Sequence, residues 1–251
     1  MYQFFVDPGA ISEKQVVITG KDVNHIKNVL RMKVGEEIAV SNGVDGREYR
    51  CGILQMTEDA VICELRFIKE DGVELPSKIY LFQGLPKADK MELIIQKAVE
   101  LGAYEIVPVA TKRAVVKLDA KKEKSKLARW QAISEAAAKQ SKRAVIPQVH
   151  SVMSYAEALT YADALDVRLI PYEMAEDMAK TRSLIEEIRP GQSIGIFIGP
   201  EGGFAPEEIE QAMAHATQPI TLGKRILRTE TAGMTVLSIL MYTFEGQELK
   251  A

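Results

Sequence analysis

The chain has 251 residues, of which 47% are hydrophobic and 27% charged, the balance of an ordinary globular protein. Its length allows one large domain, or a small domain and a medium one. The longest apolar stretch near the C-terminus, residues 234–242, is far shorter than the about 20 residues of a membrane-spanning helix. Residues 1–10 lack the basic segment of a secretory signal. These features argue against a membrane protein and against a secreted one.

Cysteine usage points to a reducing compartment. Cys51 and Cys63 are too few to form a disulfide framework in a chain of this length, and their spacing fits no zinc-binding pattern. We therefore expect two reduced thiols, no bound metal ion and a cytoplasmic location.

Positive charge is concentrated in one part of the chain. The formal net charge of −3 alone argues against a nucleic-acid-binding protein. Residues 112–143, however, contain 11 Lys or Arg and 3 Asp or Glu, so this stretch carries +8 and the rest of the chain −11. A basic stretch in an acidic protein indicates a polyanionic partner. The alternative is a lysine-rich loop followed by the solvated face of a helix.

Residues 1–74 have the pattern of a compact β-barrel-like domain. Asn-Gly and Asp-Gly pairs, which are typical of hairpin turns, separate β-branched or alternating stretches. These stretches predict strands at residues 36–41, 47–54 and 60–68. One helix interrupts the strands: Asp22 can cap it, and Val23, Ile26 and Leu30 lie on its apolar face.

Asp71, Gly72 and Pro76 indicate a boundary between domains 1–74 and 75–251. After the boundary, apolar strands alternate with amphipathic helices. Strands are predicted at residues 78–83, 105–109, 167–170, 194–198 and 219–222. Helices are predicted at residues 91–101, 125–141, 175–188, 206–216 and 230–244. The alternation predicts an α/β domain with a mostly parallel sheet covered on both faces.

The first candidate site is the segment 198–204, with the sequence Ile-Gly-Pro-Glu-Gly-Gly-Phe. It follows a predicted strand and precedes a helix that has Pro206 at a favoured first-turn position. Glycines there let the backbone approach a ligand closely, and ligands of open parallel sheets bind at the carboxyl ends of strands. The segment is neither a P-loop nor a G-x-G-x-x-G fingerprint. The alternative is a tight strand-to-helix turn without a ligand.

The second candidate site is the segment 222–232, Leu-Gly-Lys-Arg-Ile-Leu-Arg-Thr-Glu-Thr-Ala, which also joins a predicted strand to a helix. Thr229 can cap that helix, and Glu230 is favoured by the helix dipole. Arg225 and Arg228 precede the helix N-terminus, where positive charge is unfavourable. These two arginines therefore indicate a bound anion or a carboxylate partner.

Together the two segments resemble the paired cofactor loops of the SPOUT methyltransferases, and most closely those of the RsmE family. That family methylates N3 of a uridine, uridine 1498, in the 16S rRNA of the small ribosomal subunit. Further stretches that fit the family are residues 5–7, 25–31, 87–102, 111–113 and 129–143, the last ending near Pro147. The resemblance thus covers nearly the whole chain.

The resemblance implies a PUA-like RNA-binding β-barrel at residues 1–74, followed by a SPOUT-type α/β domain with a deep trefoil knot. It implies that S-adenosylmethionine binds in the knot as the cofactor. It also implies a homodimer with each active site near the subunit interface. The expected partner is 16S rRNA or the small ribosomal subunit, and the expected role is rRNA processing in ribosome biogenesis.

Site residues follow from the resemblance by position. The expected cofactor-binding residues are Gly199, Glu201, Gly202, Leu222, Gly223, Leu227, Thr229 and Thr231. We expect Arg228 to stabilise negative charge on the uracil oxygens. Glu201 or Glu230 is expected to accept the N3 proton or to orient Arg228. The alternative is a structural arginine–carboxylate pair that shapes the loop.

RNA contacts are expected mainly from basic residues, because phosphate contacts by such residues make affinity salt-dependent. The expected residues are His25, Arg31, Lys87, Lys90, Lys112, Arg113, Arg129 and Arg143. His25 is otherwise a plain surface or capping residue. Trp130 can stack on a base, although core packing in an amphipathic helix explains it as well.

Three other functions remain open at this point. A non-catalytic RNA chaperone or ribosome-assembly factor explains the basic stretch but leaves the two loops without a purpose. Another SPOUT enzyme would act on transfer RNA or on a ribose hydroxyl. An unrelated nucleotide-binding enzyme is disfavoured because both phosphate-loop fingerprints are missing.

Overall fold

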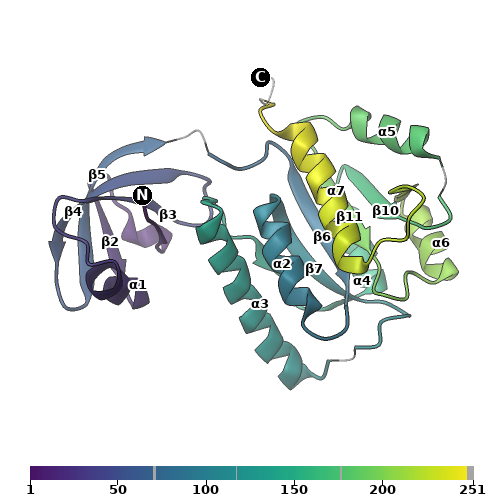
Figure 1. The fold of residues 1–251 in the computed structure, drawn as a ribbon, viewed down its shortest axis with the longest axis horizontal. Coiled ribbons are helices and arrows are strands. Elements are labelled where there is room, and N and C mark those ends of the chain that lie inside the picture. The colour runs from purple at the N-terminus through teal and green to yellow at the C-terminus, as the bar shows by residue number, and fades with distance from the viewer. Residues whose placement is uncertain (70–71, 117, 176, 248–251) are drawn as a thin grey trace. The chain divides into compact units, whose positions relative to one another are not determined.

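The chain forms two compact units in the computed structural model, and each is described by itself (Figure 1). The structure describes residues 1–69, 72–116, 118–175 and 177–247, so Asp71 of the expected boundary lies outside the described residues. The first unit comprises Met1–Glu74 and Ala138–Ile146. The second comprises Leu75–Ala137 and Pro147–Ala251.

A five-stranded sheet with the order β1-β3-β4-β5-β2 forms the first unit. Its strands are β1 (Gln3–Phe5), β2 (Gln15–Thr19), β3 (Glu37–Ser41), β4 (Glu48–Met56) and β5 (Ala60–Lys69). β1 pairs with β3 in parallel, and the other pairs are antiparallel. The predicted helix is present as α1 (Lys21–Asn24), which continues into a π-helical turn at His25–Val29.

Alternate strand residues build the core of the first unit, because successive side chains in a strand point to opposite faces. Val16, Ile18, Val61 and Cys63 are all buried in it. Both cysteines are free thiols, as expected, and burial raises the pKa of Cys63 to about 12. Such a thiol is unreactive at neutral pH.

Two details of this unit differ from the sequence-based expectation. Gly20, not Asp22, is the N-cap of α1; Asp22 is buried in the first turn, with Lys139 Nζ 3.4 Å from its carboxylate. The segment Ala138–Ile146, which the sequence placed in the second domain, makes its contacts within the first unit. Glu74 holds this segment by accepting hydrogen bonds from the amides of Ala144 (3.1 Å) and Val145 (3.2 Å).

The second unit is built on a fully parallel sheet with the order β12-β10-β11-β6-β7-β8, to which β9 adds by pairing with β7. The strands are β6 (Lys78–Gly84), β7 (Ala103–Ala110), β8 (Gln148–Val149), β9 (Met153–Ser154), β10 (Val167–Pro171), β11 (Ser193–Ile198) and β12 (Gln218–Ile220). The helices are α2 (Lys90–Glu100), α3 (Ala120–Gln140), α4 (Tyr155–Ala162), α5 (Met178–Glu187), α6 (Pro206–Ala214) and α7 (Thr229–Phe244).

Helices cover both faces of this sheet, which confirms the predicted α/β class. On one face, Phe82 and Phe197 stack with ring centroids 4.4 Å apart and pack with Leu159 of α4 and Ile209 of α6. On the other face, α2 and α7 lie side by side over β6, β7 and β11 (Figure 1). In the described part of the chain, no helix is long and apolar enough to cross a membrane.

Candidate active site

The first candidate loop packs backbone to backbone against the end of β6. It leaves β11 at Gly199, and the Gly203 amide donates 2.9 Å to the Pro200 carbonyl, which closes a tight turn with Gly203 at φ +65°. A Cβ atom at Gly84 would lie 2.7 Å from the backbone nitrogen of Pro200, which is closer than Cβ atoms come to other heavy atoms in proteins. Gly84 therefore permits the close contact that holds this loop at the carboxyl end of β6.

The second candidate loop runs from the end of β12 to the start of α7. Gly223 has φ +102°, a left-handed conformation that favours glycine. Among the described residues, no hydrogen-bond partner is found for the backbone amides of Leu222 and Leu227. The amides of Leu222 and Leu227 are therefore among the donors of this loop that are free for a ligand; the amide of Gly223 is not, because it donates to Thr221 Oγ1 at 3.2 Å.

Thr229 joins the two loops. Contrary to the expectation, it does not cap α7. It is the first residue of the helix, Arg228 is the N-cap, and no side chain caps it. The Thr229 hydroxyl donates to the Gly199 carbonyl at 2.6 Å and accepts a hydrogen bond from Gln83 Nε2 at 2.8 Å. The sequence pattern did not single out Gln83, which is fully buried at the end of β6.

Lys90 lies between the two carboxylates expected in catalysis. Its Nζ is 3.0 Å from Glu201 Oε1 and 3.3 Å from Glu230 Oε2. The Lys87 amide donates to Glu201 as well, at 3.1 Å. Burial raises the pKa of Glu201. The hydrogen bonds from its own amide and from Lys90 lower the pKa by more than burial raises it, so the net value is below the usual range. The hydrogen bond to Glu201 also raises the pKa of Lys90, so Lys90 is an ammonium ion committed to these carboxylates.

Arg228 stands apart from this cluster. Its side chain is exposed and makes no hydrogen bond or ion pair to another described residue. The alternative of a structural Arg228–carboxylate pair is therefore wrong for this structure, because Glu201 and Glu230 pair with Lys90. An exposed cation at the first turn of a helix lies against the field of the helix dipole and is available to an anion.

Two basic residues after β7 lie against the first loop and α6. Arg113 Nη1 donates to the Gly202 carbonyl at 3.0 Å, and a Cβ atom at Gly202 would lie 3.2 Å from Arg113 Cβ. The Lys112 amide donates to the buried carboxylate of Glu208 at 2.7 Å, while the Lys112 side chain is exposed. Arg113 therefore borders the first loop, and Lys112 borders the start of α6, where it pairs with Glu207 at 3.3 Å.

The other expected RNA-binding residues are scattered. In the second unit, Lys87 is exposed, and Arg129 is exposed with its Nε 2.7 Å from Glu92. In the first unit, His25 and Arg31 are exposed.

The burial of Arg143 contradicts its assignment to an RNA-binding surface. It is only 4% exposed, and its guanidinium Nε donates to the Glu74 carboxylate at 3.1 Å. A buried cation needs a paired carboxylate, and Glu74 supplies it. Trp130 is also buried, at 2% exposure, so its core-packing interpretation holds in place of base stacking.

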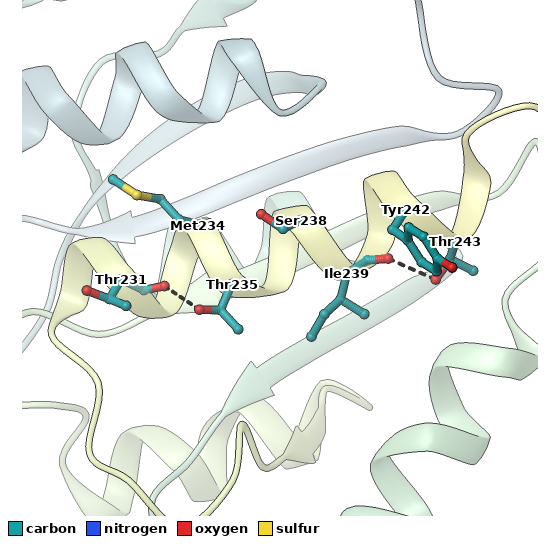
Figure 2. Close-up of a pocket in the computed structure, with 7 residues that line it drawn as sticks. All are labelled: Thr231, Met234, Thr235, Ser238, Ile239, Tyr242 and Thr243. Carbon is teal, nitrogen blue, oxygen red and sulfur yellow. Dashed lines mark hydrogen bonds between the residues drawn. The ribbon is translucent and has the colours of Figure 1, made fainter.

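Thr231 lies in the first turn of α7. It lines a shallow groove of about 440 Å³ along the outer face of α7 (Figure 2). The lining residues are uncharged, and they are Thr231, Met234, Thr235, Ser238, Ile239, Tyr242 and Thr243. Within it, Tyr242 is 85% exposed, an unusual exposure for so large a side chain. The described residues contain no cluster of three potential metal ligands.

Comparison with known proteins gives consistent matches over both units. The family described as "RNA methyltransferase domain" matches residues 73–241, and the one described as "RNA methyltransferase PUA domain" matches residues 18–66. The Bacillus subtilis protein named ribosomal RNA small subunit methyltransferase E is 39% identical over 231 residues, which cover 91% of this chain and 90% of that protein. Its namesake in Mesomycoplasma hyopneumoniae is 37% identical over 95% of this chain and 98% of its own.

Solved structures agree with these matches. Ribosomal RNA small subunit methyltransferase E from Neisseria gonorrhoeae, bound to S-adenosyl methionine, is 31% identical with a TM-score of 0.83, covering 97% of this chain and 98% of that chain. A putative methyltransferase from Legionella pneumophila, in complex with the same cofactor, is 31% identical with a TM-score of 0.81, covering 96% and 97%. The expected PUA-like first unit and SPOUT-type second unit are thereby confirmed.

Proposed function

Because the chain belongs to the family of RNA methyltransferases named ribosomal RNA small subunit methyltransferase E, we propose that it methylates N3 of a uridine in 16S rRNA with S-adenosylmethionine as the methyl donor. One observation of the structure carries this proposal. The two glycine-containing loops, at the ends of β11 and β12, are hydrogen-bonded to each other through Thr229. Lys90 with its two carboxylate partners, Glu201 and Glu230, borders them, as does Arg228.

The residues of the two loops fit this cofactor. The free amides of Leu222 and Leu227 are donors of the kind that an adenine ring accepts. Gly199, Gly202 and Gly223 allow the close backbone approach that a cofactor in the loops requires. When bound, S-adenosylmethionine supplies the electrophilic methyl group, and the protein supplies orientation and electrostatics. Thr231, on the outer face of α7, is less suited to a direct cofactor contact.

Arg228 is the proposed catalytic residue. Methylation of N3 requires the uracil to lose its N3 proton, which leaves negative charge on the neighbouring oxygens. The exposed Arg228 guanidinium is suited to stabilise that charge, because no carboxylate of the described residues neutralises it. We propose Glu230 as the proton acceptor. The lowered pKa of Glu201 makes it a poor proton acceptor, and we assign it to holding Lys90.

The proposed RNA contacts are revised by the structure. Lys90 and Arg143 are withdrawn, because each is largely covered as well as paired: Lys90 lies between two carboxylates, and Arg143 is buried against Glu74. The remaining residues are exposed, and they are His25, Arg31, Lys87, Lys112, Arg113 and Arg129; the pairs of Lys112 with Glu207 and of Arg129 with Glu92 leave these two cations exposed to solvent. Of these, Arg113 borders the first loop and Lys112 borders the adjoining start of α6, and the two are our first choice for contacts near the target nucleotide.

We further propose that the protein is a homodimer formed through the outer face of α7. That face carries an uncharged groove with exposed Tyr242 and Ile239. Depletion of charge and enrichment in aromatic residues and methionine are features of interface centres. The trefoil knot of the second unit and the cytoplasmic location are likewise proposals, and both rest on the family.

The test is transfer of labelled methyl groups from S-adenosylmethionine to purified RNA classes. The proposal expects label in RNA of the small ribosomal subunit and none in transfer RNA. Label in transfer RNA would instead support a different SPOUT specificity. Failure to bind the cofactor in a calorimeter would point to a non-catalytic RNA-binding protein.

A further inference from the structure

A buried chain of hydrogen bonds connects β6 to both candidate cofactor loops. Gln83 Nε2 donates to Thr229 Oγ1 at 2.8 Å, and the Thr229 hydroxyl donates to the Gly199 carbonyl at 2.6 Å. Gln83 is 0% exposed and Thr229 is 5% exposed, so water does not compete for these bonds. The three residues come from the end of β6, the start of α7 and the end of β11.

The direction of each bond in this chain is fixed. A hydroxyl has one proton, and Thr229 uses it toward Gly199, so the bond to Gln83 must be donated by the amide of Gln83. The same Gln83 Nε2 also donates to the Gly84 carbonyl at 3.0 Å. A flipped amide would place Oε1 against that carbonyl, acceptor against acceptor. Gln83 thus keeps one orientation, although its buried Oε1 lacks a hydrogen-bond partner among the described residues.

We propose that Gln83 and Thr229 are positioning residues that hold the two loops in the geometry in which they bind cofactor. The inference rests on the proposed function, and it changes the role of Thr229 from a cofactor contact to a link between the loops. Gly199 lies in the first loop, and Thr229 ends the second. Without the link, binding would have to order the two loops against each other, which lowers affinity.

Replacement of Thr229 separates this role from general stability. Thr229→Val keeps the shape and removes the hydroxyl, whereas Thr229→Ser keeps the hydroxyl. We expect Thr229→Val to raise the Kd for S-adenosylmethionine about tenfold, as measured by calorimetry on the full chain. The Kd of Thr229→Ser should stay within about threefold of the wild-type value. The KM for the cofactor should rise while kcat at saturating cofactor changes little. Thr160→Val is the matched control, because the exposed Thr160 hydroxyl bonds to a helix carbonyl on α4.

A second variant guards against a folding defect. Gln83→Met fills a similar volume without a donor and should weaken cofactor binding as Thr229→Val does. If either folded variant binds S-adenosylmethionine as tightly as the wild type, even with a lowered Tm, this chain of hydrogen bonds is only structural and the inference is overturned. If the wild type itself does not bind S-adenosylmethionine, the proposed function has failed instead.

Discussion

Arg228 is the residue on which the proposed chemistry depends most. We predict that Arg228→Ala lowers kcat for methyl transfer at least about a hundredfold, the usual scale for removing a group that stabilises developing charge. Its Kd for S-adenosylmethionine should stay within about threefold of the wild type, because the loop amides remain. Lys224→Ala, which removes an exposed cation in the same loop, is the control. Normal turnover by Arg228→Ala would sink the assignment.

Gly202 tests the position of the first loop. A Cβ atom there would lie 3.2 Å from Arg113 Cβ, and the two methyl groups of a valine would extend further. We predict that Gly202→Val displaces the loop and abolishes cofactor binding in a calorimetric titration. Gly9→Val is the control, since nothing lies within 4 Å of a Cβ atom at Gly9 in the first unit. Unchanged binding by Gly202→Val would show that the cofactor site is elsewhere.

Arg143 is predicted to act on stability and not on RNA affinity. Removing one partner of a buried ion pair leaves the other uncompensated, so Arg143→Ala should lower the free energy of unfolding by about 3 kcal/mol in urea titrations. The exposed neighbour Lys142, replaced by Ala, provides the control. A loss no larger than that of Lys142→Ala would refute the structural role.

These residues also show what sequence reasoning misses at this scale. Charge along the chain predicted that Lys90 and Arg143 bind RNA, because a sequence shows cations but not the carboxylates that fold against them. Glu201 and Glu230 lie more than a hundred positions from Lys90, and Glu74 lies far from Arg143. Gln83 gave no signal for the same reason: its role exists only once β6, β11 and α7 are assembled.

At the scale of elements, a cluster formed by β7, α4 and the residue after β8 gives the second unit a dependence on pH. His150 Nε2 and the Tyr161 hydroxyl both lie 2.7 Å from Glu105 Oε2. Burial raises the pKa of Glu105, but these two hydrogen bonds lower it more, to a net value below normal. Because the pKa of Glu105 is lower in the folded than in the unfolded protein, ionisation of Glu105 stabilises the fold. This stabilisation is fully present above the unfolded pKa of about 4.3 and is lost as pH falls through the folded pKa.

We therefore predict that Glu105→Gln reduces the acid sensitivity of the protein. Between about pH 5 and about pH 3, the free energy of unfolding should fall less steeply for the variant than for the wild type. The exposed Glu245, replaced by Gln, should leave the slope unchanged. Equal slopes for wild type and Glu105→Gln would contradict the account of this cluster.

Most elements of the second unit could be predicted, because apolar periodicity marks both buried parallel strands and amphipathic helices. The helix α4 was missed although its start carries a full capping box between Ser154 and Glu157. The β-branched strand β2 was missed as well. The π-helical turn at His25–Val29, with Ile26 buried in the core, has no comparable sequence signal.

At the scale of the whole molecule, α3 shows the limit of dividing a chain by sequence. It begins in the second unit, and its last residues, with the segment to Ile146, belong to the first. Alanine-rich periodicity predicts one long helix but cannot reveal that its end returns to another unit. Arg143 in this segment pairs with Glu74, and the two residues lie far apart in sequence.

Assembly is the next prediction at this scale. Tyr242→Glu places a charge in the uncharged groove on α7, where Tyr242 is 85% exposed (Figure 2). We predict that light scattering finds a dimer for the wild type and a monomer for this variant, because an unpaired charge is costly in an interface. Val115→Glu, at another exposed apolar residue, is the control. A wild-type monomer would refute the proposed dimer.

The most direct test of the central claim is to identify the nucleoside that receives the methyl group. Unmodified small ribosomal subunits and naked 16S rRNA are incubated with labelled S-adenosylmethionine and the protein, and the digested RNA is analysed by mass spectrometry. We predict N3-methyluridine in at least one of the two substrates, and the comparison shows whether assembly is required. A methyl group on a ribose or on another base, or no transfer to either substrate, would contradict the proposed function.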